Sequence, residues 1–216
     1  MKFISIFVVS ALFIGVSAFR LASTGKPWQN KSQSIPGRLQ CEFYDEGGEG
    51  VAYHDADALN NGSGKLNPAN GTYLNEFRMK EGVDISYTKG KDIDNNPYNT
   101  VAPEMDQLYV GWTQPGEWIR YTVQVKEAGI YTVGLMYTSH DDGTIALDLD
   151  GKRISKDLLV KSTYAAGDTI AWRQWHHWNK AEALGEVALS KGTHVLTLHT
   201  VGAGQMNYDY LEFKKR

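Results

Sequence analysis

The spacing of apolar residues constrains the fold of this chain most strongly. Apolar and polar residues alternate over 119–125 and again over 145–149, so each segment can bury one face of a strand and leave the other in solvent. Such runs recur at roughly ten-residue spacing between turn residues, without the crossover helices that a parallel sheet needs. The clearest predicted strands are 117–125, 130–137, 144–149, 183–189 and 193–200. We therefore predict an all-β chain, an antiparallel β-sandwich of the jelly-roll type.

Long inserted loops interrupt the strand pattern between Asn60 and Pro103. Turn residues cluster at 60–64, 70–71 and 94–97, and a short strand is predicted only around 83–85. Loops of this length in a compact domain often carry function, although surface insertions change stability little. Their length alone therefore does not assign them a role.

The N-terminus has the pattern of an export signal. Lys2 precedes an almost wholly apolar run over 3–16, and small residues stand at 16 and 18, as at a signal-peptidase site. We expect cleavage after Ala18, and the alternative is an uncleaved membrane anchor. The expected organisation is a signal peptide (1–18), a flexible leader (19–34) and a sandwich module (35–216). This predicts a secreted protein, extracellular, periplasmic or at the cell surface, with no membrane span after cleavage.

Charge and cysteine content exclude other classes. The chain carries 22 Lys and Arg against 25 Asp and Glu, a net charge of −3, and no basic cluster. A nucleic-acid partner is therefore not expected, because binding phosphates requires concentrated positive charge. The single Cys41 cannot form an internal disulfide, and we interpret it as a small buried hydrophobe.

Catalytic motifs are absent from the sequence. It contains no metalloprotease, nucleophile-elbow, phosphate-loop or dinucleotide motif. His176 and His177 are adjacent, so on a strand they would point to opposite faces and form a poor chelate. Asp150-Gly151 predicts a hairpin turn. The carboxylates that a glycoside hydrolase could use are Asp45, Glu46, Glu49, Asp55, Asp57, Asp84, Glu117, Asp141 and Asp142.

The tryptophans give the most informative pattern. Trp172, Trp175 and Trp178 recur at every third residue, so on a strand they cannot all enter one core. Exposed indoles at loop ends are unfavourable unless they bind a ligand, and their flat faces suit the C–H faces of sugar rings. We assign Trp112 and Trp172 to a ligand and expect Trp118 and Trp175 to belong to the core.

Several segments together resemble the family 6 carbohydrate-binding modules, β-sandwiches usually attached to secreted glycoside hydrolases. The resemblance extends from about Ile35 to Phe213. The segments that carry it are 39–55, 82–85, 110–123 and 207–213. It implies a sugar-binding cleft at the loop end of the sandwich, where a pyranose lies between two aromatic rings. By motif, the rings match Trp112 and Trp172, an amide that hydrogen-bonds the sugar matches Asn207, and His54 completes the cleft.

The same resemblance implies a structural Ca²⁺ between the first and last strands. Its oxygen ligands match Gln40, Glu42 and Asp209, and hard oxygen ligands suit Ca²⁺. Gln40 stands where an acidic residue is common in the family, and Cys41 stands where alanine is usual.

These observations predict a non-catalytic, secreted carbohydrate-binding protein whose ligand is a polysaccharide or oligosaccharide of β-glucan or agar type. The main alternative is a small secreted glycoside hydrolase or lyase that uses loop carboxylates. A further alternative is an adhesion protein that keeps the fold without sugar binding. A shared fold does not decide among them.

Overall fold

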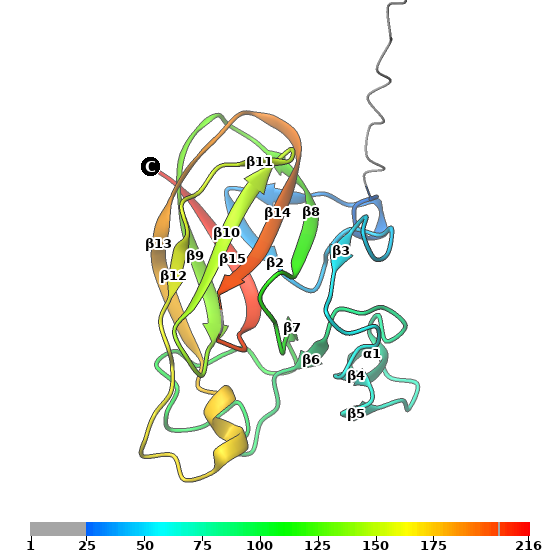
Figure 1. The fold of residues 1–216 in the computed structure, drawn as a ribbon, viewed down its shortest axis with the longest axis vertical. Helices are drawn as coiled ribbons and strands as arrows, with labels where there is room; N and C mark the ends of the chain where they lie inside the picture. Colours follow the sequence, from blue (N-terminus) through cyan, green and yellow to red (C-terminus); the bar gives the residue numbers. More distant parts are fainter. Residues whose placement is uncertain (1–24, 203) are drawn as a thin grey trace, which may run out of the picture.

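Two β-sheets pack face to face and enclose the core (Figure 1). The computed structural model describes residues 25–202 and 204–216, so the expected signal peptide lies outside the described residues. The first sheet has the order β1 (Gln33–Ile35), β8 (Trp118–Val125), β14 (Gly192–Gly202), β10 (Gly143–Leu149) and β11 (Lys152–Arg153), with β3 (Tyr53–His54) paired to β8 and β12 (Leu158–Val160) to β10. The second has the order β13 (Asn179–Leu189), β9 (Gly129–Thr138), β15 (Asn207–Lys215), β7 (Leu108–Val110) and β6 (Ile85–Tyr87), with β2 (Gly37–Gln40) paired to β15.

The predicted β-sandwich is confirmed, and alternation explains why its strands form. In β8 every second residue is buried, beginning at Ile119, and Tyr121 lies opposite Leu196 of β14. In the other sheet, Leu135 of β9 lies opposite Leu211 of β15, and both are fully buried. Buried side chains of the two sheets therefore meet in one core.

The five predicted strands correspond to β8, β9, β10, β13 and β14, and the short strand near 83–85 corresponds to β6. Asp150 and Gly151 both have positive φ and join β10 to β11, which confirms the hairpin turn. Cys41 is a buried free thiol, as predicted.

The N-terminal segment differs from the sequence prediction. Residues 25–34 are not a loose leader: they contain the 3₁₀ turn η1 (Trp28–Asn30) and the start of β1. Gln33 pairs with Val123 in parallel, and its side-chain amide bonds the backbone carbonyls of Gln40 and Phe43. A polar composition concealed this segment because backbone pairing and amide bonds hold it, together with a single indole, Trp28, that packs against Phe77.

The long insertion forms a small lobe beside the sandwich (Figure 1). It contains β4 (Ser63–Gly64), β5 (Asn67–Pro68) and the short helix α1 (Tyr73–Glu76). Arg78 is buried and donates to the carbonyls of Tyr44 and Asp45, so one guanidinium attaches this lobe to the sandwich.

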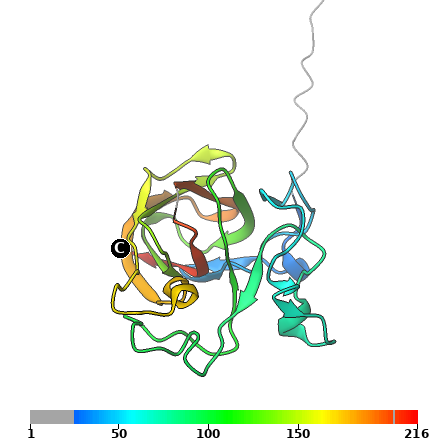
Figure 2. The same ribbon diagram turned by 60° about the horizontal axis from the view of Figure 1, so that its bottom comes forward.

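Several chain connections meet at one end of the sandwich, which is turned forward in Figure 2. Thr138 at the end of β9 lies opposite Asn207 at the start of β15, and Tyr137 lies opposite Asn179 at the start of β13. The segments that follow β7 and β9 and those that precede β13 and β15 are therefore neighbours. Within the described residues, no helix has the length and apolar character needed to cross a membrane.

Candidate functional site

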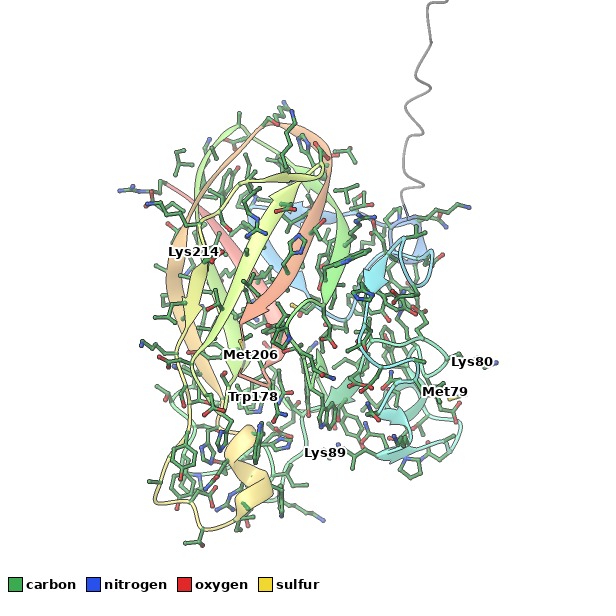
Figure 3. The ribbon with its side chains drawn as sticks, viewed as in Figure 1. Met79, Lys80, Lys89, Trp178, Met206 and Lys214 are labelled. Carbon is green, nitrogen blue, oxygen red and sulfur yellow. The ribbon has the colours of Figure 1, made fainter. Side chains whose placement is uncertain are left out.

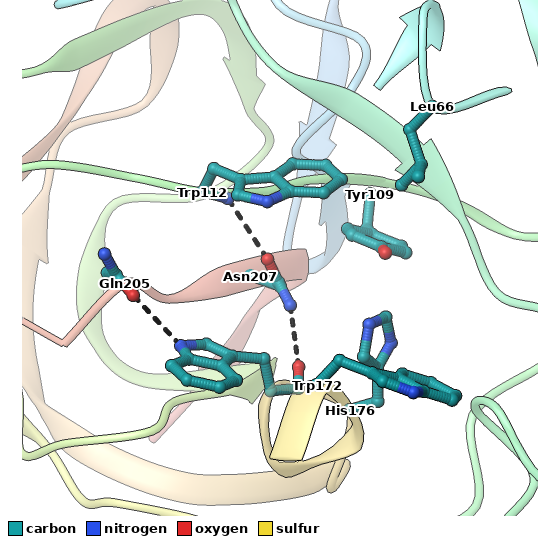
Figure 4. A pocket seen from close by; sticks show the side chains of 8 residues that line it. Leu66, Tyr109, Trp112, Trp172, His176, Gln205 and Asn207 are labelled. Carbon is teal, nitrogen blue, oxygen red and sulfur yellow. Dashed lines mark hydrogen bonds between the residues drawn. The ribbon is translucent and has the colours of Figure 1, made fainter. Parts of the chain in front are cut away.

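A cavity of about 400 Å³ opens at this end of the sandwich. Aromatic side chains dominate its lining, and a few polar groups converge on it, as in small-molecule sites generally. Figure 4 shows Trp112 and Trp172 on different sides of Asn207. The lining residues are Leu66, Tyr109, Trp112, Trp172, Trp175, His176, Gln205 and Asn207.

Trp112 lies two residues after the end of β7 and is held in an unusual backbone conformation. Its φ is 51°, in the left-handed region, where a bulky residue other than glycine is a genuine outlier. Gln205, across the cavity lining, has a φ of 44°. Such strain costs about 1–3 kcal/mol per residue and tends to concentrate at functional sites. Trp112 is 37% exposed and lines the cavity, so part of this residue is accessible to a ligand.

Trp172 and Trp175 both lie on the 3₁₀ helix η2 (Ala171–Trp175). Residues three apart on such a helix lie on the same side, and both indoles line the cavity. Trp172 is 54% exposed. The Trp175 ring stacks on His140 with centroids 4.3 Å apart, and its Nε1 donates to Gln205 Oε1 at 3.1 Å.

Asn207 connects the two tryptophan-bearing segments. Its Oδ1 accepts the backbone N–H of Trp112 at 3.2 Å, while Nδ2 donates to Thr138 Oγ1 at 2.8 Å and to the Trp175 carbonyl at 2.9 Å. Gly111 permits this approach, because a Cβ there would lie 2.9 Å from Asn207 Oδ1. Both amide hydrogens are therefore used within the protein, and only Oδ1 keeps capacity to accept another bond.

Buried carboxylates hold the loop around η2. Asp94 accepts from Trp178 Nε1 at 2.7 Å and lies 2.8 Å from His176 Nδ1. Asp168 contacts the Arg173 guanidinium and His177 Nε2. The hydrogen bond from Arg173 is the main reason that the pKa of Asp168 falls far below its usual value. The adjacent histidines thus contact different carboxylates, in agreement with the structural interpretation of the pair.

The structure brings together three of the four predicted cleft residues. Trp112, Trp172 and Asn207 line one cavity, but His54 does not. His54 lies on β3 opposite Trp118, exposed, with its Nδ1 2.6 Å from Glu49 Oε1. The pairing of β3 with β8 places His54 away from the aromatic cavity. This pairing joins segments that are distant in the chain, so the sequence around His54 did not reveal it.

The prediction that Trp175 belongs to the core is wrong. Trp175 is partly exposed in the cavity, whereas Trp178 is fully buried where β13 begins (Figure 3). Trp118, also expected in the core, is half-buried beneath the Arg120 guanidinium. The pairs 172/175 and 175/178 have the same spacing, so the sequence pattern allowed two registers. The start of β13 at Asn179, directly after Trp178, decides that the pair 172/175 lies in the cavity.

The predicted metal ligands lie together where β2 meets β15. Gln40 pairs with Tyr210, and the Cys41 N–H donates to the Asp209 carbonyl at 2.9 Å. Gln40 Oε1, Glu42 Oε2 and Asp209 Oδ1 are each buried without a hydrogen-bond partner. Burial raises the pKa of Glu42, and burial followed by the charge of Glu104 raises the pKa of Asp209 to about 7. The unsatisfied oxygens fit a cation, because buried acceptors without partners are strongly unfavourable.

This site lacks a third charged or imidazole ligand. Among residues 25–202 and 204–216, no three His, Cys, Asp or Glu side chains gather closely enough to hold a metal ion. Any cation here must therefore use the neutral amide of Gln40 with the two carboxylates, an oxygen donor set that Ca²⁺ accepts.

Comparison with known proteins identifies the family. A family model described as carbohydrate binding module (family 6) matches residues 84–215. The chain belongs to this family. No curated protein matches the sequence. The fold resembles that of CsCBM6-3 from Clostridium stercorarium in complex with cellobiose, with a TM-score of 0.51 and 14% identity over 86% of this chain and 98% of that one.

Part of a larger enzyme has a similar fold. A glycoside hydrolase family 43 arabinoxylan arabinofuranohydrolase from Bacillus subtilis, in complex with cellotetraose, matches with a TM-score of 0.50 and 17% identity over 86% of this chain. The present chain spans 28% of the length of that enzyme.

Proposed function

We propose that this family 6 module binds a polysaccharide or oligosaccharide in the cavity between Trp112 and the η2 tryptophans, without catalysis. The observation that carries the proposal is the strained backbone of Trp112, whose N–H is fixed by Asn207 beside an aromatic cavity. Strain of this kind persists only where the surroundings impose it.

The chemistry of the cavity suits a sugar ring. Indole faces cover the apolar C–H faces of a pyranose, while polar groups at the edge bond its hydroxyls. Gln205, His176 and the Oδ1 atom of Asn207 supply such groups. The cavity opens at the loop end, so an oligosaccharide can extend out of it.

A β-linked glucan or a galactan of agar type is the ligand class we propose. CsCBM6-3 is described in complex with cellobiose, and the arabinofuranohydrolase in complex with cellotetraose, which supports testing β-glucans first. The export signal predicted from the sequence supports a role outside the cytoplasm, where such polysaccharides occur.

Affinity gel electrophoresis against soluble β-glucans, xylan and agar tests the proposal, with reducing ends assayed in parallel. We expect at least one polysaccharide to retard migration while no new reducing ends appear. Release of reducing ends would instead establish an enzyme. Unchanged migration with every polysaccharide, together with no binding to any glycan on a broad array, would exclude sugar binding.

The hydrolase alternative has one observation in its favour. Asp55, Asp57, Asp84 and Glu117 form an acidic cluster, and burial with the nearby charge of Glu117 raises the pKa of Asp55 to about 7. A protonated carboxylic acid at neutral pH is what a glycosidase acid requires. However, none of these residues lines the aromatic cavity, so the cluster and the proposed sugar site are separate. The reducing-end assay decides this point.

Asn207→Ala is expected to weaken glycan binding at least tenfold and to lower the free energy of unfolding by about 1–3 kcal/mol, since it leaves buried partners unsatisfied. Calorimetric titration and urea unfolding measure the two effects. Asn75→Ala is the matched control, because Asn75 Nδ2 donates to Pro68 O away from the cavity. The control should lose stability and keep binding. Full glycan affinity in Asn207→Ala would contradict the positioning role of this amide.

We also propose that Gln40, Glu42 and Asp209 hold a structural Ca²⁺. Their three unsatisfied buried oxygens support this assignment. The ion would join the first and last strands of a sandwich that has no disulfide to do so.

A further inference from the structure

A second cavity of about 320 Å³ lies between the N-terminal segment and the inserted lobe. It shares no residue with the aromatic cavity at the end of the sandwich. Residues 25–34 and α1, which build much of it, precede the part of the chain matched by the family model. Its lining residues are Trp28, Gln29, Lys31, Ser32, Gln33, Ser34, Arg38, Phe43 and Tyr73.

Aromatic rings form one side of this cavity. Phe77 packs edge-on against Trp28 and Tyr73, at centroid distances of 5.3 and 5.2 Å, and contacts Phe43 at 6.0 Å. Phe77 is buried beneath them, whereas Tyr73 remains 58% exposed. The result is a rigid aromatic platform that presents an amphipathic ring to solvent, an arrangement that suits the face of a sugar.

Positive charge lies on the other side. Lys31 and Arg38 line the cavity, and none of its lining residues is acidic. Lys31 is exposed and forms no ion pair with any described residue. Arg38 contacts the exposed carboxylate of Glu104 at 3.1 Å and lies 4.3 Å from the centre of the Tyr210 ring. The cavity therefore has a net positive lining on a chain whose overall charge is −3.

Neutral hydrogen-bonding groups accompany these charges. The Gln33 amide is committed to the backbone of Gln40 and Phe43, so it shapes the cavity rather than serving a ligand. Ser32, Ser34 and Gln29 have hydroxyl and amide groups to offer. Gln29 and Asn30 both have positive φ, at 51° and 58°, so the backbone turn that carries this side of the cavity is itself strained.

We propose that this cavity is a second sugar site, specific for an anionic glycan unit that carries a carboxylate or a sulfate ester. The sugar ring would pack on Tyr73, and its acidic group would pair with Lys31 and Arg38. A guanidinium binds planar oxyanions in a bidentate manner, and a lysine adds a mobile point charge. A neutral β-glucan would leave Lys31 without an ionic partner, and Arg38 paired only with the exposed Glu104, so the two cavities select different glycan chemistry. Their joint occupation by one polysaccharide would raise the apparent affinity through effective concentration.

Calorimetric titration of the full chain with three oligosaccharides tests this. Oligogalacturonate supplies carboxylates, a carrageenan oligosaccharide supplies sulfate esters, and a cello-oligosaccharide is neutral. We expect one of the two anionic ligands to bind and Lys31→Glu to weaken that binding about tenfold, with little change for the neutral ligand. Binding should also weaken with salt, because the charges are near the surface. The anionic oligosaccharide whose binding Lys31→Glu weakens identifies the acidic group as a carboxylate or a sulfate ester.

The matched control is Lys156→Glu, since Lys156 is exposed and lines none of the cavities described here. Tyr73→Ala is a second variant that removes the ring without changing charge, and it should also weaken anionic binding. Trp112→Ala should leave anionic binding intact, which separates this site from the proposed function. Equal effects of Lys31→Glu and Lys156→Glu, or no binding of either anionic oligosaccharide, would overturn the proposal.

Discussion

Trp175→Ala and Trp112→Ala are each expected to abolish measurable binding of the neutral glycan while the sandwich stays folded. A buried aromatic anchor can contribute ~2 kcal/mol or more to an interface, whereas a millimolar affinity corresponds to only about −4 kcal/mol. Loss of one ring therefore brings a weak sugar site below detection. Trp172→Ala should reduce binding as well, because this indole also lines the cavity. Isothermal titration with the best glycan from the electrophoresis panel measures all three.

Two further variants control for folding. Trp178 is fully buried and donates to Asp94, so Trp178→Ala should lower the free energy of unfolding by about 3–5 kcal/mol. At position 112, alanine keeps the strained φ of 51°, whereas glycine relieves it. Trp112→Gly should therefore be more stable than Trp112→Ala and equally unable to bind.

Two results would remove the aromatic cavity as the sugar site. One is wild-type affinity in both Trp112→Gly and Trp175→Ala. The other is an equal loss of affinity in Tyr73→Ala, a ring outside the cavity. If Trp175→Ala loses as much free energy of unfolding as Trp178→Ala, its loss of binding reflects loss of structure rather than loss of a contact with the sugar.

Strand positions could be predicted because a strand with one buried face requires apolar and polar residues to alternate in the sequence. The alternation at Ile119, Tyr121 and Val123 matches β8 residue by residue. The hairpin at Asp150-Gly151 was equally local, since both residues tolerate positive φ. Local patterns of this kind carry most of the information about the sandwich.

The rest of the site depends on contacts between distant segments. Asn207 is bonded to Trp112, 95 positions earlier, and to the carbonyl of Trp175, and neither bond leaves a pattern in composition or spacing. The three tryptophans from 172 to 178 were visible, but their order of burial depends on where β13 begins. His54 was misplaced for the same reason, because its position follows from pairing with β8.

Addition of Ca²⁺ to chelator-treated protein is expected to raise the thermal midpoint by about 5–10 °C. An ion bound only by the folded state stabilises it by about 2.7 kcal/mol at 100 times its Kd, and 1 kcal/mol shifts the midpoint of a chain of this size by roughly 2–4 °C. Differential scanning calorimetry measures the shift. Mg²⁺ at the same concentration should have a smaller effect, because it demands stricter geometry and keeps its water.

The sign of the variant effects distinguishes an ion site from a simple polar contact. Without Ca²⁺, Asp209→Asn and Glu42→Gln should be at least as stable as the wild type, because each removes a buried acid whose ionisation is unfavourable. With Ca²⁺ they should be less stable, because each removes a charged ligand. Glu212→Gln is the matched control on β15, since Glu212 pairs with Lys180 and Lys214 and should leave the calcium response unchanged.

The pH dependence follows from the same burial. The pKa of Asp209 is raised to about 7 in the folded chain, above the value near 4 of an unfolded aspartate. A raised pKa contributes stability at low pH that is lost as the pH rises through the folded value. The calcium-free protein should therefore lose stability between about pH 4 and pH 7, whereas saturating Ca²⁺, which favours the carboxylate, should remove that loss. If chelator leaves both the thermal midpoint and its pH dependence unchanged, the three oxygens do not hold an ion, and water must satisfy them instead.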